Sequence, residues 1–340
     1  MNKYDEYYEF RYATIDDVDA IMKFIHDYWS ENHILANDKD FFMYEFCNGN
    51  RVGYFLAIDK ETKEIAAGWA IYYYTETFIP SESDVSSGML YAKPNSKVPF
   101  LGVELMRRKF ETLNSRAHVS PGVNMKTAGP LVKKWIKNDV SRLSHFYRLN
   151  DIDEYKIAKI QNKCIQEINE EIPQTDLTEV KTVEELYNIY NDKMFKNRRP
   201  YKDRWYIEKR YFNHPIYKYK VLVSSEQIVI VGREVEVNES VVFRIVDILG
   251  DVSKFCMLGK AIQKLIDDNN YEYVDLYELA MNPDDIIAAG FTERIIDDEN
   301  TIPNYFEPYC CKNIEIYAHR SDIDTLCFKG DGDQDRPSHR

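Results

Sequence analysis

The strongest constraint on the fold of this chain is an order of segments that occurs in both halves. Thr14-Ile15-Asp16-Asp17 and Thr182-Val183-Glu184-Glu185 both have the pattern of a capping box, which marks the start of a helix. Each is followed by apolar residues at helical spacing, a second helix, a β-hairpin, and then alternating strands and helices. This order predicts an α/β fold (an α+β mixed sheet), with a mixed central sheet flanked by helices in each half.

The predicted elements also suggest where the chain divides. In the first half, strands are expected at 8–13, 54–58, 65–74, 88–92, 117–123 and 142–149, with helices at 18–29, 38–46, 101–113 and 128–137. In the second half, helices are expected at 183–194, 205–212, 258–266 and 284–289, with strands at 218–224, 228–235, 241–249, 273–279 and 312–318. The polar segment 155–171 has helical spacing and is broken at Pro173. We therefore expect a first domain at 1–154, a helical connection at 155–178, a second domain at 179–325 and a tail at 326–340.

Composition and charge exclude several classes of partner. The chain has 44 Lys+Arg against 57 Asp+Glu, a net charge of −13, whereas proteins that bind nucleic-acid backbones usually carry a basic surplus. No apolar run reaches the roughly 18 residues of a membrane-spanning helix, and the N-terminus does not have the pattern of a signal peptide. The 6 cysteines include no CxxC pair, so no metal site is expected. We expect a cytoplasmic protein without bulk nucleic acid as a partner; its oligomeric state stays open.

Three stretches of sequence carry a family resemblance. They are FRYATIDDVDAIMKFI near the start, VSPGVNMKTAGPLVKKWIKNDVSRLSHFYRL at the end of the first half, and YVDLYELAMNPDDIIAAGF in the second half. With the repeated order of elements, they resemble the GCN5-related N-acetyltransferase (GNAT) fold, present twice in tandem. The resemblance covers most of residues 8–320. It implies a CoA-dependent N-acyltransferase that uses acetyl-CoA or another acyl-CoA and a small-molecule amine acceptor, such as an amino sugar or nucleotide-linked sugar of surface polysaccharide biosynthesis.

The resemblance also implies where the cofactor would bind. The family holds the acyl-CoA pyrophosphate at a Gln/Arg-x-x-Gly-x-Gly/Ala loop before a helix, where backbone N–H groups and the helix dipole attract an anion. The matching stretch here is 97–102, in which Lys97, Phe100, Leu101 and Gly102 are candidate contacts, with Phe100 at the first glycine position. Further candidates are Leu90, Tyr91 and Asn124, with Arg107 and Arg108 nearby. The stretch 253–260 fits the pattern less well, so the first half is expected to hold the cofactor.

Candidate catalytic residues lie between the first two helices, where the family receives its acceptor. His33 could remove a proton from the amine near neutral pH, with Glu31 beside it. The alternative is that His33 caps a helix or lies in a solvated loop. The tyrosine that the family often uses as a general acid would fall near Val132 or Ile286, and neither side chain donates a proton.

Candidate substrate-binding residues gather in the second half. The densest basic and aromatic cluster of this acidic chain is Arg199, Tyr201, Arg204, Trp205, Tyr211 and His214. Such side chains suit a phosphorylated or nucleotide-linked substrate, although a solvated, salt-bridged helix has the same composition. Arg244 and Asp247 lie in an apolar strand and, three residues apart, point to opposite faces, either as structural ion pairs or as part of a site.

The end of the chain and the missing motifs leave two alternatives open. Asp331, Asp333 and Asp335 alternate as in calcium loops, but the glycine and the distal glutamate of such loops are missing, which favours a solvated tail. The chain has no nucleophile elbow, Walker loop or dinucleotide fingerprint. Besides the acyltransferase, the residues allow a FemABX-like aminoacyl transferase or a non-catalytic GNAT-like binding module.

Overall fold

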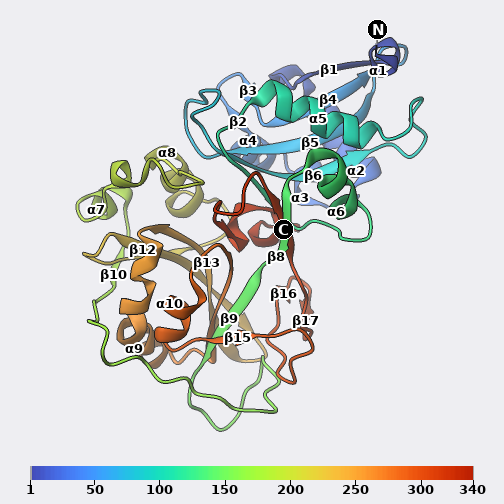
Figure 1. The fold of residues 1–340 in the computed structure, drawn as a ribbon. Coiled ribbons are helices and arrows are strands. Elements are labelled where there is room, and N and C mark those ends of the chain that lie inside the picture. Colours follow the sequence, from blue (N-terminus) through green and yellow to red (C-terminus); the bar gives the residue numbers. More distant parts are fainter. Residues whose placement is uncertain (1, 340) are drawn as a thin grey trace. The chain divides into compact units, whose positions relative to one another are not determined.

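The computed structural model describes residues 2–339 and divides into two compact units (Figure 1). Unit 1 contains the chain up to Val140, Tyr317–Ile323, and the end of the chain from Gly332. Unit 2 contains Ser141–Ile316 and Asp324–Asp331. Each unit has its own mixed sheet with flanking helices, so the predicted α/β class is confirmed. The units do not follow the predicted limits at 154 and 178, because late segments of the chain return to both of them.

Unit 1 is built on a seven-stranded sheet. Its order is β1 (Tyr8–Tyr12), β4 (Tyr54–Asp59), β5 (Ile65–Tyr73), β6 (Val85–Ala92), β7 (His118–Pro121), β18 (Tyr317–Arg320) and β8 (Asp139–Arg142). Neighbours from β1 to β6 pair antiparallel, whereas β6 and β7 pair parallel. Parallel neighbours need a crossover connection, which here contains a helix, α5.

Helices cover the two faces of this sheet. The helices α2 (Val18–Tyr28), α3 (Ile34–Asn37) and α4 (Lys39–Phe46) pack on one face against Tyr54 and Tyr72, among other residues. On the other face, α5 (Leu101–Leu113) packs against Phe55 and Trp69. Side chains alternate between the faces of a strand, which explains why neighbouring residues such as Tyr54 and Phe55 join different clusters. The unit also contains α1 (Lys3–Tyr7), the short strands β2 (Cys47–Asn48) and β3 (Arg51–Val52), α6 (Ala128–Leu131) and a π-helical turn, Val132–Ile136.

Unit 2 has a sheet of the same mixed kind. Its order is β10 (Thr178–Val180), β11 (Lys220–Val223), β12 (Ile228–Val237), β13 (Ser240–Gly250), β14 (Tyr273–Leu279), β9 (Ser144–Leu149) and β15 (Thr292–Arg294), and β19 (Cys327–Phe328) pairs with β14. Again, the parallel pair, β13 and β14, is joined through a helix, α9 (Gly259–Asn269). The remaining elements include α7 (Val183–Tyr187), α8 (Arg204–Ile207), α10 (Pro283–Ala288) and the hairpin of β16 (Tyr305–Phe306) and β17 (Tyr309–Cys310).

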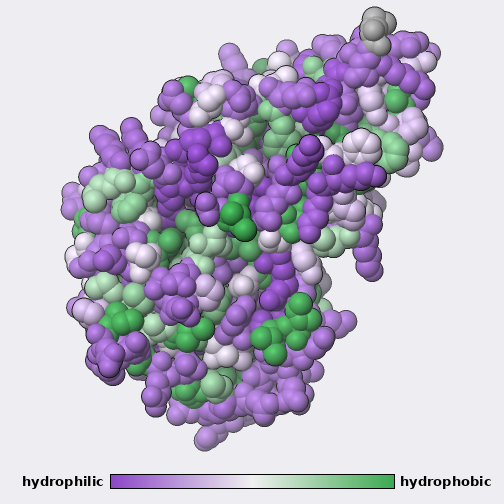
Figure 2. Space-filling model, viewed as in Figure 1, coloured by the Kyte–Doolittle hydropathy of each residue, from purple (hydrophilic) through white to green (hydrophobic). Residues whose placement is uncertain are grey.

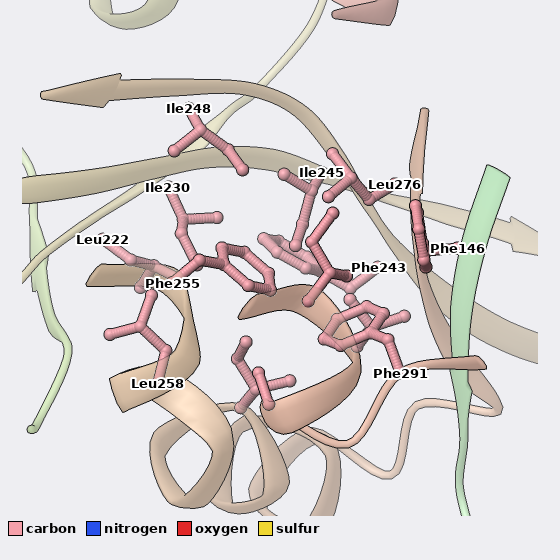
Figure 3. Close-up of a cluster of buried hydrophobic side chains, with 14 of the residues drawn as sticks. Phe146, Leu222, Ile230, Phe243, Ile245, Ile248, Phe255, Leu258, Leu276 and Phe291 are labelled. Atoms are coloured by element: carbon pink, nitrogen blue, oxygen red, sulfur yellow. The ribbon is translucent and has the colours of Figure 1, made fainter. Parts of the chain in front are cut away.

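The main core of unit 2 lies between its sheet and the segment from 252 to 291. Figure 3 shows Ile230, Phe243 and Ile245 of the strands facing Phe255 and Leu258. All these side chains are buried, and each one contributes roughly 1.5–3 kcal/mol to folding by its burial.

The closing strands differ from the prediction in their partners. The strand β9, predicted to close the first half, pairs with β14 in unit 2. The strand β18, in the region predicted to close the second half, pairs with β7 in unit 1. Hydrophobic periodicity indicates that a strand is buried and does not specify the sheet that it joins.

Two further predictions are wrong. The expected helix at 155–171 does not form, because the buried carboxylate of Glu272 accepts the backbone N–H groups of Lys156, Ile157 and Ala158 at 2.7–3.0 Å. The expected solvated tail is buried: the exposed fraction is 0% for Asp331 and 1% for Asp335. Among residues 2–339, no three His, Cys, Asp or Glu side chains are grouped as metal ligands would be.

The face of the molecule drawn in Figure 2 is mainly hydrophilic, and hydrophobic residues form small separate groups on it. None of the helices within residues 2–339 has both the length and the hydropathy needed to cross a membrane.

Candidate functional site

In unit 1, the two parallel strands diverge at one point. The strands β6 and β7 pair only at Val85–His118 and Ser86–Val119. Beyond this, the Ser120 hydroxyl donates to the carbonyl of Ser87. The next residues of β6 include Met89, which has φ 50° and lies at the register shift between β5 and β6. This bulge turns β6 away from β7 and changes the direction of its backbone N–H groups.

The carboxylate of Asp333 occupies this point of divergence. Its Oδ2 accepts the backbone N–H of Met89 at 3.2 Å, and its Oδ1 accepts the hydroxyl of Tyr72 at 2.6 Å. A Cβ atom at Gly88 would lie 2.5 Å from Oδ2, so only glycine leaves room for this carboxylate. Burial, with the negative charge of Asp333, raises the pKa of Tyr72 well above its usual value, which keeps this hydroxyl a donor.

Neighbouring residues fix the segment that carries Asp333. The guanidinium of Arg336 forms a buried ion pair with Glu45 at 2.5 Å and lies 3.8 Å from the centre of the Tyr72 ring. It also donates to the carbonyl of Gly332 at 2.6 Å. The carbonyl of Ser338 accepts the N–H of Ile34 at the start of α3. The C-terminal segment is therefore part of the folded unit, which the sequence did not predict; the alternation of Asp331, Asp333 and Asp335 was its one visible signal.

The loop before α5 has the backbone conformation of a glycine-containing loop. Phe100 directly precedes α5 with φ 62° and ψ 28°, a left-handed conformation that costs a non-glycine residue energy, and its side chain is 68% exposed. A Cβ atom at Gly102 would touch only the Cβ of Ala92, at 3.6 Å, so the helix starts beside the end of β6. The buried side chain of Leu101 belongs to the core under α5.

The basic side chains near this loop are engaged with carboxylates. Lys97 Nζ contacts Asp59 at 2.9 Å and Glu61 at 2.7 Å, so its side chain is held by these groups. Arg107 and Arg108 both pair with Glu104 on α5. Among the backbone N–H groups here, that of Lys97 donates to the hydroxyl of Tyr8, and those of Val103 and Glu104 donate to the carbonyl of Phe100.

The other predicted contacts of unit 1 are dispersed along the same strand and loops. Leu90 packs in the cluster on the α5 face, whereas Tyr91 packs with Tyr28 and Phe24 on the α2 face. Asn124 is exposed; its Oδ1 accepts the N–H of Lys126 and its carbonyl accepts the N–H of Gly129.

The predicted catalytic residues lie at the start of α3. His33 caps this helix, because its Nδ1 accepts the N–H of Leu35 at 3.2 Å, and burial lowers its pKa despite the opposing charge of Asp333. The ring is therefore neutral at pH 7 with its proton on Nε2. Glu31 is exposed. Beside them is a surface pocket of about 370 Å³, lined by Asn32, Ile34, Asn37, Asp38, Lys39 and Asp40.

In unit 2, the chain itself fills the corresponding divergence. The strands β13 and β14 pair from Phe243–Val274 to Ile245–Leu276 and no further. Beyond this point, β19 pairs with the end of β14, and Gly330 lies so close to β13 that a Cβ atom would be 2.7 Å from the carbonyl oxygen of Val246. Residues 327–331 therefore occupy the place that a ligand would take between these strands.

A buried ion-pair network lies at the same level of unit 2. Lys202 Nζ contacts Asp247 at 2.6 Å and Asp331 at 2.7 Å, and the hydroxyl of Tyr211 donates to Asp247. Burial alone would lower the pKa of Lys202, but the two carboxylates raise it above its usual value. Of the predicted residues, Tyr211 and Asp247 meet here. Lys202 was not singled out from the sequence, and Asp331 was expected in a solvated tail.

The start of α9 in unit 2 is also covered. The side chain of Gln174 accepts the N–H of Lys260 at 3.0 Å, and a Cβ atom at Gly259 would lie 2.6 Å from Ile168. A surface pocket of about 520 Å³ beside it is lined by Gln174, Thr175, Asp176, Thr178, Ile189, Val223, Ser225 and Lys260. The segment predicted as a connection thus takes the place that an anion would occupy at this helix end.

The remaining residues of the basic and aromatic cluster do not converge. Tyr201 donates to Asp192 at 2.7 Å, and Arg204 pairs with Glu184 at 2.7 Å on the surface. Trp205 is half-buried and Arg199 is exposed. His214 Nδ1 accepts two backbone N–H groups of its own loop. Arg244 is buried in an ion pair with Asp275 at 2.8 Å and also donates to Asn304.

Comparisons with known proteins agree with this architecture. The sequence matches no family model, and no curated protein matches it. Among solved structures, it is similar to a GCN5-related N-acetyltransferase from Anabaena variabilis (8% identity, 92% of this chain and 72% of that chain, TM-score 0.53). It is also similar to a probable N-acyltransferase from Enterococcus faecalis (7% identity, 94% and 73%, TM-score 0.52) and to a GCN5-related N-acetyltransferase from Kribbella flavida (9% identity, 94% and 72%, TM-score 0.50). The chain therefore has a GNAT-like fold.

Proposed function

We propose that the chain is a CoA-dependent N-acyltransferase and that unit 1 binds the acyl-CoA. The observation that carries this proposal is the divergence of β6 from β7 at Met89, next to a left-handed turn at Phe100 that starts α5. The C-terminal segment lies at the divergence in both units, as Asp333 in unit 1 and as residues 327–331 in unit 2. The helix starts differ, because Gln174 and Ile168 cover the start of α9 in unit 2, whereas a Cβ atom at Gly102 would meet only Ala92. The contrast favours one cofactor site in the chain, located in unit 1.

The two faces of the unit 1 sheet give the two substrates separate approaches. Val98 and Leu101, from the loop and α5, belong to the cluster on one face. Tyr72 and Met89 belong to the cluster on the other face, which α2, α3 and α4 cover. We assign the first face to the acyl-CoA and the second to the amine, so that they meet where β6 and β7 separate.

The residues of unit 1 would act mainly by positioning and by hydrogen bonding. When bound, an acyl-CoA would supply a thioester whose acyl carbon bonds to the acceptor nitrogen as its C–S bond breaks, releasing CoA as the thiol and one proton from the ammonium form of the acceptor. The N–H groups of β6 near Leu90 and Tyr91 would hold the carbonyl oxygen, and those at the start of α5 would hold the pyrophosphate. The neutral His33 would present its Nε2–H to the acceptor, which leaves water as the proposed route for the proton.

Calorimetry with acetyl-CoA and free CoA tests the proposal on the full chain. We expect micromolar binding of both by the natural protein and loss of binding in Gly102→Glu, because a carboxylate at the start of α5 would repel the pyrophosphate. The matched variant in unit 2 is Lys260→Glu, at the start of α9, and it should bind both ligands as the natural protein does.

Each contrary result has a definite meaning. Binding that survives Gly102→Glu and disappears in Lys260→Glu would move the cofactor site to unit 2. If the natural protein binds neither ligand, the acyltransferase proposal fails and the aminoacyl transferase and the binding module remain. If binding is confirmed, a screen of primary amines that includes amino sugars and nucleotide-linked amino sugars would identify the acceptor.

A further inference from the structure

We propose that the carboxylate of Asp333 binds the ammonium group of the acceptor, so that unit 1 selects a primary amine that arrives as a cation. This inference rests on the function proposed above and adds to it the residue that recognises the amine. Asp333 lies at the divergence of β6 and β7, on the face assigned to the acceptor, where its two oxygens meet Tyr72 and Met89.

The first argument is the uncompensated charge of this carboxylate. Asp333 accepts hydrogen bonds from two neutral donors, the hydroxyl of Tyr72 and the N–H of Met89. Within residues 2–339, no lysine, arginine or histidine side chain forms an ion pair with this carboxylate. The nearby Arg336 pairs with Glu45. A half-buried carboxylate in such a place is stabilised when a cation binds to it.

The second argument comes from unit 2, where the chain supplies the cation. Asp247 lies two residues after the last paired position of β13, just as Gly88 lies two residues after that of β6. At this level, the ammonium group of Lys202 contacts Asp247 and Asp331. A primary ammonium group thus meets a carboxylate of the C-terminal segment in unit 2, and Asp333 offers a carboxylate without such a partner in unit 1.

The third argument is that Asp333 is held in place before any ligand binds. The buried pair of Arg336 and Glu45, the contact of Arg336 with the Tyr72 ring, and the hydrogen bond from Tyr72 all fix the same short segment. A carboxylate that is already oriented loses little conformational freedom when it binds an ammonium group. This rigidity suits a recognition role.

Two thioethers of CoA test the inference by equilibrium binding. S-(2-aminoethyl)-CoA carries an ammonium group two carbons from the sulfur atom, and S-propyl-CoA has the same shape without charge. By calorimetry on the full chain, we expect the natural protein to bind the aminoethyl compound at least about tenfold more tightly, as a charge-assisted hydrogen bond predicts. The ratio of the two affinities should fall to about one in Asp333→Asn. It should persist in Asp16→Asn, an exposed charge-matched control in the same unit.

The outcomes separate this inference from the proposed function. If neither thioether binds to the natural protein, the proposed function itself fails. If both thioethers bind equally well to the natural protein, the acyl-CoA site stands and the role of Asp333 is overturned. A preference for the aminoethyl compound that survives in Asp333→Asn also overturns this role. Should Asp333→Asn fail to fold, Tyr72→Phe replaces it; removal of the orienting hydroxyl should reduce the preference severalfold, and an unchanged preference would overturn the inference.

Discussion

Asp331 and Asp333 are two residues apart in the sequence, yet their carboxylates lie in different surroundings. In unit 2, Asp331 is buried and contacts the ammonium group of Lys202 at 2.7 Å. In unit 1, Asp333 is held by the neutral donors of Tyr72 and Met89. The same kind of sheet therefore carries a buried ion pair in one unit and a carboxylate held by neutral donors in the other.

The starts of the helices α9 and α5 also differ between the units, because one is covered by another segment of the chain and the other is not. Gln174 and Ile168 cover the beginning of α9 in unit 2, whereas a Cβ atom added at Gly102, at the beginning of α5, would meet only the Cβ of Ala92, at 3.6 Å. Two similar folds in one chain need not keep two binding sites, because segments of the chain can take the place of a ligand. The comparison predicts that changes in unit 2 act mainly on stability and that changes in unit 1 act mainly on binding.

Replacing the buried lysine should have the largest effect. Lys202→Met would leave Asp247 and Asp331 buried without their cation, which costs about 3–5 kcal/mol of unfolding free energy. Urea denaturation measures this loss, with the exposed Lys23→Met as a control expected to stay within about 0.5 kcal/mol. If Lys202→Met is as stable as the natural protein, the ion pair does not explain the difference between the units.

Much of this architecture follows from local sequence patterns. The predicted helix at 101–113 and strand at 273–279 have the same bounds as α5 and β14. Apolar spacing and capping residues are local signals, and they specify where an element forms and which of its sides is buried.

Long-range partners could not be predicted in this way. The helical spacing at 155–171 did not reveal that Glu272 would bind the backbone of Ile157 and its neighbours in place of a helical turn. The alternating aspartates of the tail looked solvated because their partners, Lys202 and Tyr72, lie more than a hundred residues away in the sequence. For the same reason, the alternation of aspartates did not reveal the contacts of Asp333 with Tyr72 and Met89.

Acidification should destabilise both units through their buried histidines. Burial, helped by the nearby Lys109, lowers the pKa of His319 to about 3 and that of His118 well below its usual value in unit 1. Below a pH of about 6.5, the unfolded chain binds protons that the folded unit does not, so stability falls as the pH is lowered toward about 3. For His319, this amounts to about 2 kcal/mol at pH 5.

Urea denaturation from pH 7.5 to pH 5 measures this dependence. His319→Gln should reduce the loss of stability on acidification by about 2 kcal/mol. In unit 2, burial lowers the pKa of His145 to about 4 against the opposing effect of Asp275, so His145→Gln tests the same window there. If the unfolding free energy falls equally steeply with pH in His319→Gln and in the natural protein, this ring is already protonated in the folded unit.

The two glycines at the helix starts give a smaller, matched contrast. Gly259→Ala would place a Cβ atom 2.6 Å from Ile168 and should cost about 1–2 kcal/mol, because the covering segment must move. Gly102→Ala meets only an ordinary contact at 3.6 Å and should stabilise unit 1 by about 0.5–1 kcal/mol through helix propensity. Urea denaturation of both variants tests the contrast, and equal effects would mean that the start of α9 is no more covered than that of α5.

The smallest expected effect concerns the residues that precede these helices. Phe100 adopts φ 62°, where a side chain costs roughly 1 kcal/mol, whereas its counterpart Leu258 has φ −96° and a buried side chain. Phe100→Gly should therefore stabilise the protein by about 0.5–1 kcal/mol and retain the binding of acetyl-CoA, since the backbone N–H groups of the loop remain. Leu258→Gly removes a core side chain and should lower the free energy of unfolding, by an amount several times larger than the gain expected from Phe100→Gly. Loss of acetyl-CoA binding in Phe100→Gly would instead assign the exposed ring a direct contact with the ligand, and the loop of unit 1 would then bind through its side chain as well as its backbone.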